Sequence, residues 1–355
     1  MIYYAIVLIL LILGYFLKRK YYCIVSALML IAFAGLRADS VGTDTGMYRL
    51  LYNNMQYINS FDGLLRERAA STLNVEWGYY LAEFIFQKFV TFDIFKVIVA
   101  TVTIAPWAYV IYKRSDHPAI SFVVLFTLPA YATVSLSAMR QGIAFGFSAL
   151  VVDSWMDKKT KKALLMNLLA FCFHYSAIIL LPLFFINKLK TYRHRYVSFI
   201  VPILLVVFLS STTIFLFLGQ YSRIDYEEGE AGGIGTLIFF FVLYLISFIV
   251  KDKYFREGCN KWLVYLLVYT IALWFIGMNL AAIFRLAAYT ECFLCLYISN
   301  MFSYIRKPLR NIIIIGSCLG SVLLMSRLVV SETKGNHFYP YEFIWENPYS
   351  IIQWQ

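Results

Sequence analysis

Four residues place a charged or titratable group within otherwise apolar sequence. Arg37, Arg140 and Arg285 each lie inside or directly beside an apolar run. His174 lies in the middle of the apolar run 163–186. A charge at membrane depth is costly unless it is partnered or lines a wet cavity, and arginine is preferred where a planar fork must hold phosphate or carboxylate. The arginines therefore predict a site for an anionic ligand. His174, which titrates in a useful range, is a candidate for proton transfer.

The densest polar motif of the chain is the loop 35–45. Asp44 lies between Thr43 and Thr45, whose hydroxyls could orient its carboxylate. A carboxylate at the mouth of a cavity can act as a general base. The same pattern fits an Asx-type turn or a helix cap ahead of residues 47–53. The motif alone leaves both interpretations open.

The surrounding sequence predicts an all-α polytopic integral membrane protein. The chain has 355 residues, of which 61% are hydrophobic and only 14% are charged. Apolar runs of about 20 residues, the length that crosses a bilayer core, recur from end to end. The first run lacks a basic start and a cleavage site, so we expect a retained helix rather than a signal peptide. Helices are predicted over residues 1–17, 21–36, 94–112, 118–136, 138–156, 163–186, 196–218, 234–250, 262–280, 282–301 and 311–326.

The net charge of +11 is explained by short basic segments between these runs. Such segments stay in the cytoplasm, so we attribute the charge to membrane anchoring and predict no nucleic-acid partner. The basic segments are 18–20, 113–114, 158–162, 188–195, 251–261 and 306–310. Placing all six inside puts both termini outside, together with the loop 37–92, the short loop 219–235 and the tail 327–355. One transmembrane domain then covers residues 1–355.

Two segments need special treatment in this topology. The run 163–186 lies between two basic segments, so it must cross twice or re-enter, as two short half-helices that meet near residues 173–175. This gives about twelve passes, with 10 to 13 compatible with the pattern. Residues 76–90 carry Glu76, Glu83 and Lys88 among apolar residues. We expect an amphipathic helix there, lying on the outer membrane surface.

Two residue classes have structural alternatives. The arginines outside the basic segments can form ion pairs with Asp39, Asp62 and Glu67. Cys292 and Cys295 form a CxxC pair inside a predicted helix, where packing is the expected role. The sequence therefore predicts neither a metal site nor a disulfide framework.

An ordered set of motifs runs from the second predicted helix to the tail, namely GLRADSVGTDTGMY (35–48), 76–79, 139–144, 173–177, 285–287 and 339–343. Together these motifs resemble the EpsG/Wzy-type polysaccharide polymerases. Such polymerases are similar to C-type, polyprenyl-dependent glycosyltransferases in the bacterial cytoplasmic membrane. The resemblance implies that a growing oligosaccharide on undecaprenyl diphosphate is moved to the non-reducing end of a new lipid-linked repeat unit, outside the cytoplasm. The products serve capsule, exopolysaccharide or O-antigen assembly, with a chain-length regulator as a possible partner.

This reaction suggests roles for the residues. The lipid diphosphate leaves with negative charge, which fixed cations can stabilise. We expect Arg37, Arg140 and Arg285 to hold it without a metal or other cofactor. A base must accept the proton of the acceptor hydroxyl. Asp44 is the first choice, followed by His174 and Glu76. The candidates for sugar binding are Tyr48, Trp77, Tyr79 and Gln141, and the aromatic ones could instead be interfacial belt residues.

Other functions share part of this pattern. A flippase for the same lipid-linked sugars would have a similar basic cavity, but it should show an internal repeat and a pathway to both faces. A lipid-to-acceptor ligase shares the leaving group and differs only in its acceptor. A membrane O-acyltransferase would use a membrane histidine, and a non-catalytic scaffold would not need the intramembrane arginines.

Overall fold

The computed structural model describes residues 2–70, 75–186, 234–249, 260–278, 281–305, 307–330 and 337–346, and all structural statements refer to them. Within these ranges the regular secondary structure is helical, which agrees with the predicted fold class. The first half of the chain contains α1 (Ile2–Phe16), α2 (Arg19–Gly35), α3 (Thr45–Asn54), η1 (Met55–Tyr57), α4 (Phe61–Ala70), α5 (Trp77–Phe86), α6 (Phe92–Arg114), α7 (Pro118–Thr127), α8 (Pro129–Leu136) and α9 (Met139–Met156). The second half contains α10 (Thr160–Phe173), η2 (Tyr175–Leu180), α11 (Leu183–Ile186), α13 (Ile234–Ile249), α15 (Asn260–Gly277), α16 (Ala281–Glu291), α17 (Leu294–Met301), η3 (Phe302–Tyr304) and α18 (Lys307–Val330).

Three of the described helices are long and apolar enough to cross a bilayer. They are α6, α15 and the part of α18 from Lys307 to Arg327. The pair α7 and α8 makes a fourth span if its two bent halves are counted together. Shorter apolar helices cover Ile2–Phe16 and Ile234–Ser247. The total of about twelve passes stays a prediction, and the predicted helix 196–218 and loop 219–235 lie outside the described residues, apart from the first turn of α13.

Two predicted helices are broken. The run 118–136 forms α7 and α8, which meet at an angle of 72°. Pro129 begins α8, and Leu128 before it is extended, because proline lacks an N–H and disfavours helical geometry in the preceding residue. The run 282–301 is likewise divided into α16 and α17, with the break at Cys292 and Phe293.

The run 163–186 reverses direction where the charge pattern predicted a break. α10 ends at Phe173, and His174 adopts an extended conformation (φ −157°, ψ 119°). The chain then returns through η2 and α11, and the ring of Phe184 reaches Trp155 near the end of α9, with 4.2 Å between the ring centroids. The predicted break near residues 173–175 is therefore confirmed.

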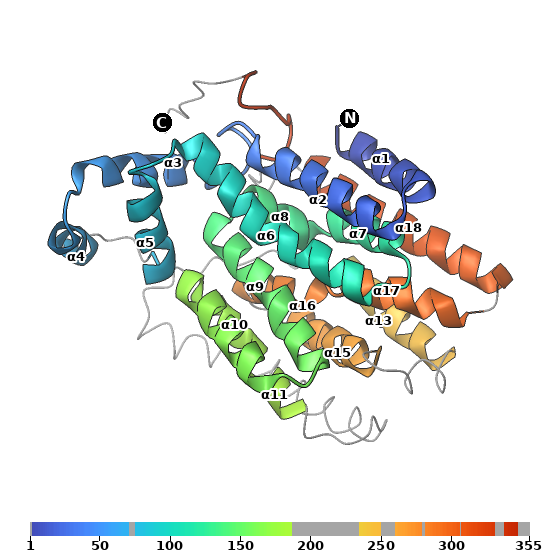
Figure 1. Ribbon diagram of the computed structural model, residues 1–355. Coiled ribbons are helices and arrows are strands. Elements are labelled where there is room, and N and C mark those ends of the chain that lie inside the picture. Colours follow the sequence, from blue (N-terminus) through green and yellow to red (C-terminus); the bar gives the residue numbers. More distant parts are fainter. Residues whose placement is uncertain are drawn as a thin grey trace.

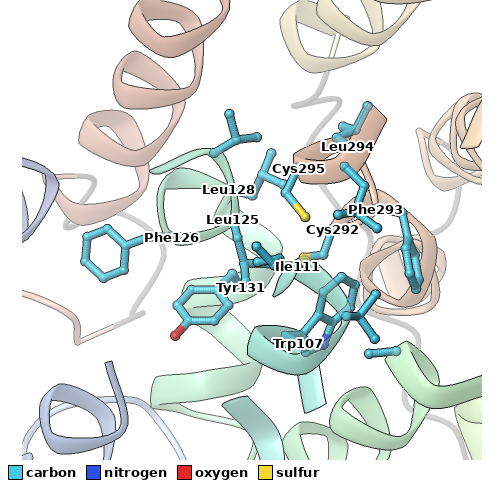
Figure 2. Close-up of a cluster of buried hydrophobic side chains, with 14 of the residues drawn as sticks. Trp107, Ile111, Leu125, Phe126, Leu128, Tyr131, Cys292, Phe293, Leu294 and Cys295 are labelled. Carbon is cyan, nitrogen blue, oxygen red and sulfur yellow. The ribbon is translucent and has the colours of Figure 1, made fainter. Parts of the chain in front are cut away.

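The helices of the first half pack in a row in which α6 lies between α2 and α9, and α10 follows α9 (Figure 1). A second group, around α7, α16 and α17, closes the core behind this row. Figure 2 shows the junction, where Trp107 of α6 lies among Leu125, Cys292 and Phe293. The indole of Trp107 donates to the Phe145 carbonyl (3.1 Å), so its polar atom is satisfied inside the core. Cys292 and Cys295 are buried and unbridged, in agreement with a packing role.

The basic segments gather at one end of the bundle, here called the basic end. Lys113 and Arg114 at the end of α6 bind the carboxylates of Asp153 and Asp157 at the end of α9. Asn300 of α17 donates to the Arg114 carbonyl (3.0 Å). Arg19 donates to the Tyr112 and Ser115 carbonyls, and Asn260 at the start of α15 contacts Asn300. Three predicted basic segments, 18–20, 113–114 and 158–162, thus meet here or adjoin it, together with the described parts 260–261 and 307–310 of two others. The sixth, 188–195, lies outside the described residues.

The opposite end, here called the loop end, unites the loop after α2 with the segment 337–346. Backbone hydrogen bonds join Ala38 to Glu342 (2.9 Å) and Ile344 to Leu36 (3.0 Å). The Tyr3 hydroxyl donates to the Phe338 carbonyl (2.7 Å), which brings the N-terminal helix to the same end. The start of the chain, the loop 37–92 and the segment 337–346 therefore share one end, as the predicted topology requires. The membrane face that this end occupies stays a prediction.

Gly35 provides a test of the packing between α2 and α6. A Cβ at this position would lie 2.8 Å from the backbone Cα of Val97, too close for the two helices to keep their separation. We expect Gly35→Ala to destabilise the protein by roughly 1–3 kcal/mol. The measurement is the Tm of the detergent-solubilised protein. Gly316→Ala in α18 is the matched control, because no atom of the described residues lies within 4 Å of its Cβ position. An equal effect of both substitutions would contradict the close approach.

Candidate active site

The loop end holds a buried carboxylate that binds two of the predicted site residues. Glu76 is only 3% exposed. Its Oε2 accepts a hydrogen bond from Arg140 Nη1 (2.6 Å), and its Oε1 lies 2.6 Å from His174 Nδ1. The Tyr175 backbone N–H is also directed at Oε1 (3.4 Å). One carboxylate thus connects α5, the first turn of α9 and the break between α10 and η2.

The local backbone explains why these three side chains meet. Glu76 is the N-cap residue of α5, with extended geometry, and its carboxylate makes no capping bond to its own helix. Arg140 is the second residue of α9, which begins after the short turn that follows α8. His174 lies where α10 ends, since its extended backbone turns the chain back. All three residues stand at helix boundaries, where side chains can point across the end of the bundle.

The two partners of Glu76 decide its charge. Burial alone would raise the pKa of the Glu76 carboxyl, but the hydrogen bond and electrostatic contact with His174 and the charge of Arg140 outweigh it and lower the pKa. Glu76 is therefore ionised at neutral pH and can only accept hydrogen bonds. Nδ1 of His174 must then be the donor. In the neutral imidazole this leaves the lone pair on Nε2, the nitrogen that a general base uses.

Aromatic residues from the loop helices form one wall of the site. Arg140 Nε donates to the hydroxyl of Tyr48 in α3 (3.2 Å), and the guanidinium lies 5.9 Å from the centre of that ring. The ring of Tyr79 in α5 lies 5.4 Å from the ring of Tyr48. The pKa of Tyr48 is raised overall. Burial is the main cause, the nearby charges of Asp44 and Glu76 add to it, and Arg140 opposes it. Both tyrosines are almost fully buried, so they pack the site rather than present free ring faces.

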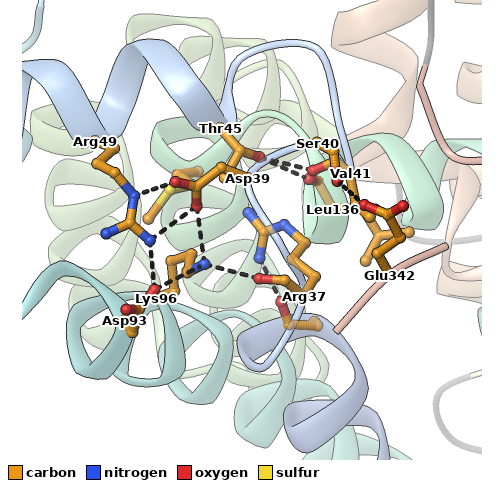
Figure 3. A network of polar contacts seen from close by, with 12 residues as sticks. Arg37, Asp39, Ser40, Val41, Thr45, Arg49, Asp93, Lys96, Leu136 and Glu342 are labelled. Atoms are coloured by element: carbon orange, nitrogen blue, oxygen red, sulfur yellow. Dashed lines mark hydrogen bonds and ion pairs between the residues drawn. The ribbon is translucent and has the colours of Figure 1, made fainter. Parts of the chain in front are cut away.

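Arg37 is a buried cation with unused donors. It is 2% exposed, and its Nη1 donates to the Ala34 carbonyl. Its Nε and Nη2 have no hydrogen-bond partner among the described residues. The neighbouring carboxylate of Asp39 is occupied by Arg49 and Lys96 instead (Figure 3). The ion-pair alternative thus holds for Arg49, whereas two donor nitrogens of Arg37, Nε and Nη2, have no partner among the described residues.

Asp44 lies at the start of α3 with no capping bond from its side chain. The flanking hydroxyls bond elsewhere: Thr43 Oγ1 lies 2.6 Å from Ser137 Oγ, and Thr45 Oγ1 donates to the Val41 carbonyl (2.9 Å). Gly42 has φ +88°, which favours glycine and shapes the turn before α3. Asp44 is half-buried near Tyr48, so its role as a base stays a prediction.

The remaining predicted residues are arranged around this centre in different ways. Gln141 follows Arg140, and its Nε2 donates to the backbone carbonyl of Arg285 (2.7 Å), which ties α16 to the start of α9. The Arg285 side chain is exposed. Trp77 is 45% exposed, and Arg68 lies over its ring at 5.6 Å, so it belongs to the outer surface of α5. No bond of Arg285 or Trp77 to Glu76 is found among the described residues.

Glu83, which the sequence suggested only as one of the charged residues of an amphipathic helix, is a buried carboxyl in the structure. It lies seven residues after Glu76, on the same side of α5, and is fully buried. Neither of its oxygens has a hydrogen-bond partner among the described residues. The exposed residues of α5 are instead apolar, namely Trp77, Leu81 and Ile85. The predicted helix in 76–90 is therefore present, and its acidic residues face the protein. The periodic spacing of Glu76 and Glu83 was the available signal.

Glu83 generates a prediction on pH dependence. Burial raises its pKa to about 8, and the nearby Tyr79 and Arg140 lower it only in part. The folded state therefore holds this proton up to a higher pH than the unfolded state does. Stability is lost as pH rises from about 4.5 to about 8, by at most about 5 kcal/mol. Glu83→Gln should remove this loss.

The measurement is the Tm as a function of pH, over a range of about 5 to 9. We expect Glu83→Gln to become progressively more stable than the unsubstituted protein as pH rises. Glu67→Gln, at an exposed position of α4, is the control and should follow the unsubstituted protein. Parallel pH curves for Glu83→Gln and the unsubstituted protein would show that the pKa of Glu83 is the same in the folded and unfolded states, which contradicts the prediction.

Comparison with known proteins identifies the family. A search of curated proteins and a search of solved structures each found no match. The profile of the EpsG family matches residues 20–343, which include Arg37, Glu76, Arg140 and His174. This range is nearly the whole chain and confirms the resemblance seen in the sequence. The chain is a member of the EpsG family.

Proposed function

We propose that the protein is a polysaccharide polymerase that joins lipid-linked oligosaccharide repeat units at the outer face of the cytoplasmic membrane. The observation that carries this proposal is the Glu76 centre, where one buried carboxylate holds both Arg140 and His174. Membership of the EpsG family supports the same role. The basic end lies opposite this centre, and basic segments stay in the cytoplasm, which supports an outward-facing site.

The proposed reaction needs a base and a place for negative charge. The acceptor hydroxyl oxygen bonds to the anomeric carbon of the growing chain, while the bond from that carbon to the lipid diphosphate breaks. The leaving diphosphate takes the electron pair, and the acceptor proton passes to the base. His174 suits the role of base because Glu76 fixes its Nδ1 and leaves Nε2 available. We therefore place His174 before Asp44, reversing the order expected from the sequence.

The diphosphate is assigned to the cations at the loop end. Arg140 lies at the N-terminal end of α9, where the helix dipole also favours negative charge. Two buried donor nitrogens of Arg37 have no partner among the described residues, and such donors suit phosphate oxygens. Fixed donors of this kind stabilise charge as it develops, without reorganisation during the reaction. Arg285 is exposed at the start of α16 and is the outermost of the three proposed contacts.

The first test is the surface glycan of a strain that lacks this gene and carries plasmid-borne variants. We expect the deletion strain to display single repeat units outside. The unsubstituted gene should restore a ladder, that is, a series of glycan chains that differ in length by one repeat unit. His174→Gln and Arg140→Ala should reduce polymerisation by roughly 10²–10⁴-fold, the range for losing an acid–base or charge-stabilising group. Asp44→Asn is included to rank the two candidate bases.

The matched controls are Glu67→Gln and Arg66→Ala, because both residues are exposed on α4. Both should restore the ladder, and membrane levels of every variant are compared by immunoblot. Loss of single repeat units from the surface in the deletion strain would assign the protein to an earlier, translocating step. A normal ladder from His174→Gln would remove His174 from the mechanism.

A second test concerns metal dependence. Since arginines supply the positive charge, polymerisation by membranes or purified protein should continue in EDTA at an unchanged rate. The assay follows ladder formation before and after chelation. Loss of activity that a divalent cation restores would contradict the assignment of the diphosphate to the arginines.

A further inference from the structure

A groove of about 450 Å³ runs between α2 and α6, away from the Glu76 centre. Its walls are almost entirely apolar, and the hydroxyl of Thr101 is satisfied by the Val97 carbonyl of its own helix (2.8 Å). One cation, Lys20, lies at one end. The lining residues on which the argument depends are Lys20, Ile31, Thr101, Ala105, Tyr109 and Tyr112.

The groove has the length of one membrane leaflet. On α2 it extends from Lys20 to Ile31, and on α6 from Tyr112 to Thr101. At a rise of about 1.5 Å per residue, each wall is roughly 16 Å long. Half of a bilayer core of about 30 Å is roughly 15 Å. A chain that fills the groove therefore runs from the membrane interface at Lys20 to about the middle of the bilayer.

The two ends of the groove differ. Beyond Ile31, toward the loop end, the two helices converge, because Gly35 of α2 contacts the backbone of Val97 in α6. At the other end lie Lys20 and two tyrosines, Tyr109 and Tyr112, and tyrosine is enriched at membrane interfaces. This end is the basic end, since Arg19 beside Lys20 donates to the carbonyl of Tyr112. A ligand must therefore carry its anionic group at the basic end and its apolar chain toward the loop end.

We propose that this groove binds one acyl chain of an anionic glycerophospholipid, with the phosphate at Lys20. The polyprenyl chain of the proposed substrate is a poorer fit, because its diphosphate would lie at the loop end, where the contact at Gly35 closes the groove. The lipid comes from the leaflet on the side of the basic end. This site does not depend on the polymerase assignment.

The experiment measures lipid retention by the purified protein. The full chain in detergent is mixed with phosphatidylglycerol or with zwitterionic phosphatidylcholine of the same acyl chains, and bound lipid is counted by native mass spectrometry. We expect one phosphatidylglycerol to be retained in preference. Ala105→Phe should fill the groove and abolish this adduct. Lys20→Gln should weaken retention of phosphatidylglycerol roughly fivefold, the factor that one basic residue near a membrane contributes.

Both substitutions are at exposed positions, so the fold should tolerate them. Lys18→Gln, in the same basic segment but outside the groove, and Leu319→Phe, exposed on α18, are the matched controls and should retain the lipid. Equal retention of the two lipids would overturn the assignment of Lys20, and an undiminished adduct in Ala105→Phe would overturn the groove. Displacement of phosphatidylglycerol by undecaprenyl phosphate would instead assign the groove to the polyprenyl chain.

Discussion

The buried carboxylate of Glu76 is the constraint on which the loop end depends. A single ionised group at 3% exposure must be paired, and its two partners come from the start of α9 and from the break after α10. Removing one partner of a buried ion pair typically costs about 3–5 kcal/mol, because the remaining charge is left unpaired. The Glu76 centre therefore fixes the relative positions of three helix boundaries. The same contacts set the tautomer of His174, so stability and reactivity depend on one group.

The two ends of the bundle differ in how fully their buried charges are paired. At the basic end, Lys113 and Arg114 are compensated by Asp153 and Asp157, which bind α6 to α9. At the loop end the compensation is incomplete, since the buried donors of Arg37 have no partner among the described residues. Buried donors are normally satisfied, so such an exception calls for a ligand or another explanation. This asymmetry is why the loop end, and not the basic end, is the candidate for binding an anion.

Much of the framework follows from hydrophobic run length and charge placement. The reversal at His174 was predictable because two basic segments flank one apolar run. The bend between α7 and α8 was not predicted, because the run 118–136 is continuously apolar, although Pro129 with its missing N–H causes it. Arg140 and His174 stood out individually as polar groups in apolar sequence. Their shared contact with Glu76 could not be predicted, since it joins residues 64 and 98 positions apart.

Side-chain direction was the hardest property to infer. Trp77 and Tyr79 are near neighbours in one motif, but Trp77 faces outward and Tyr79 is buried against Tyr48. The inward direction of Glu83 depends on how α5 packs against α3 and α10, which sequence periodicity alone does not define. For Asp44, the sequence left a choice between a helix boundary and a base. Its place at the start of α3 agrees with the boundary, although its side chain forms no cap.

The most direct test of the central claim is reconstitution with defined substrate. The purified protein is placed in liposomes with one lipid-diphosphate-linked repeat unit, and the products are resolved by mass spectrometry. We expect lipids that carry two, three and more repeat units, with one free lipid diphosphate released for each new glycosidic bond. Folded protein that moves the substrate between leaflets without forming any new glycosidic bond would contradict this expectation.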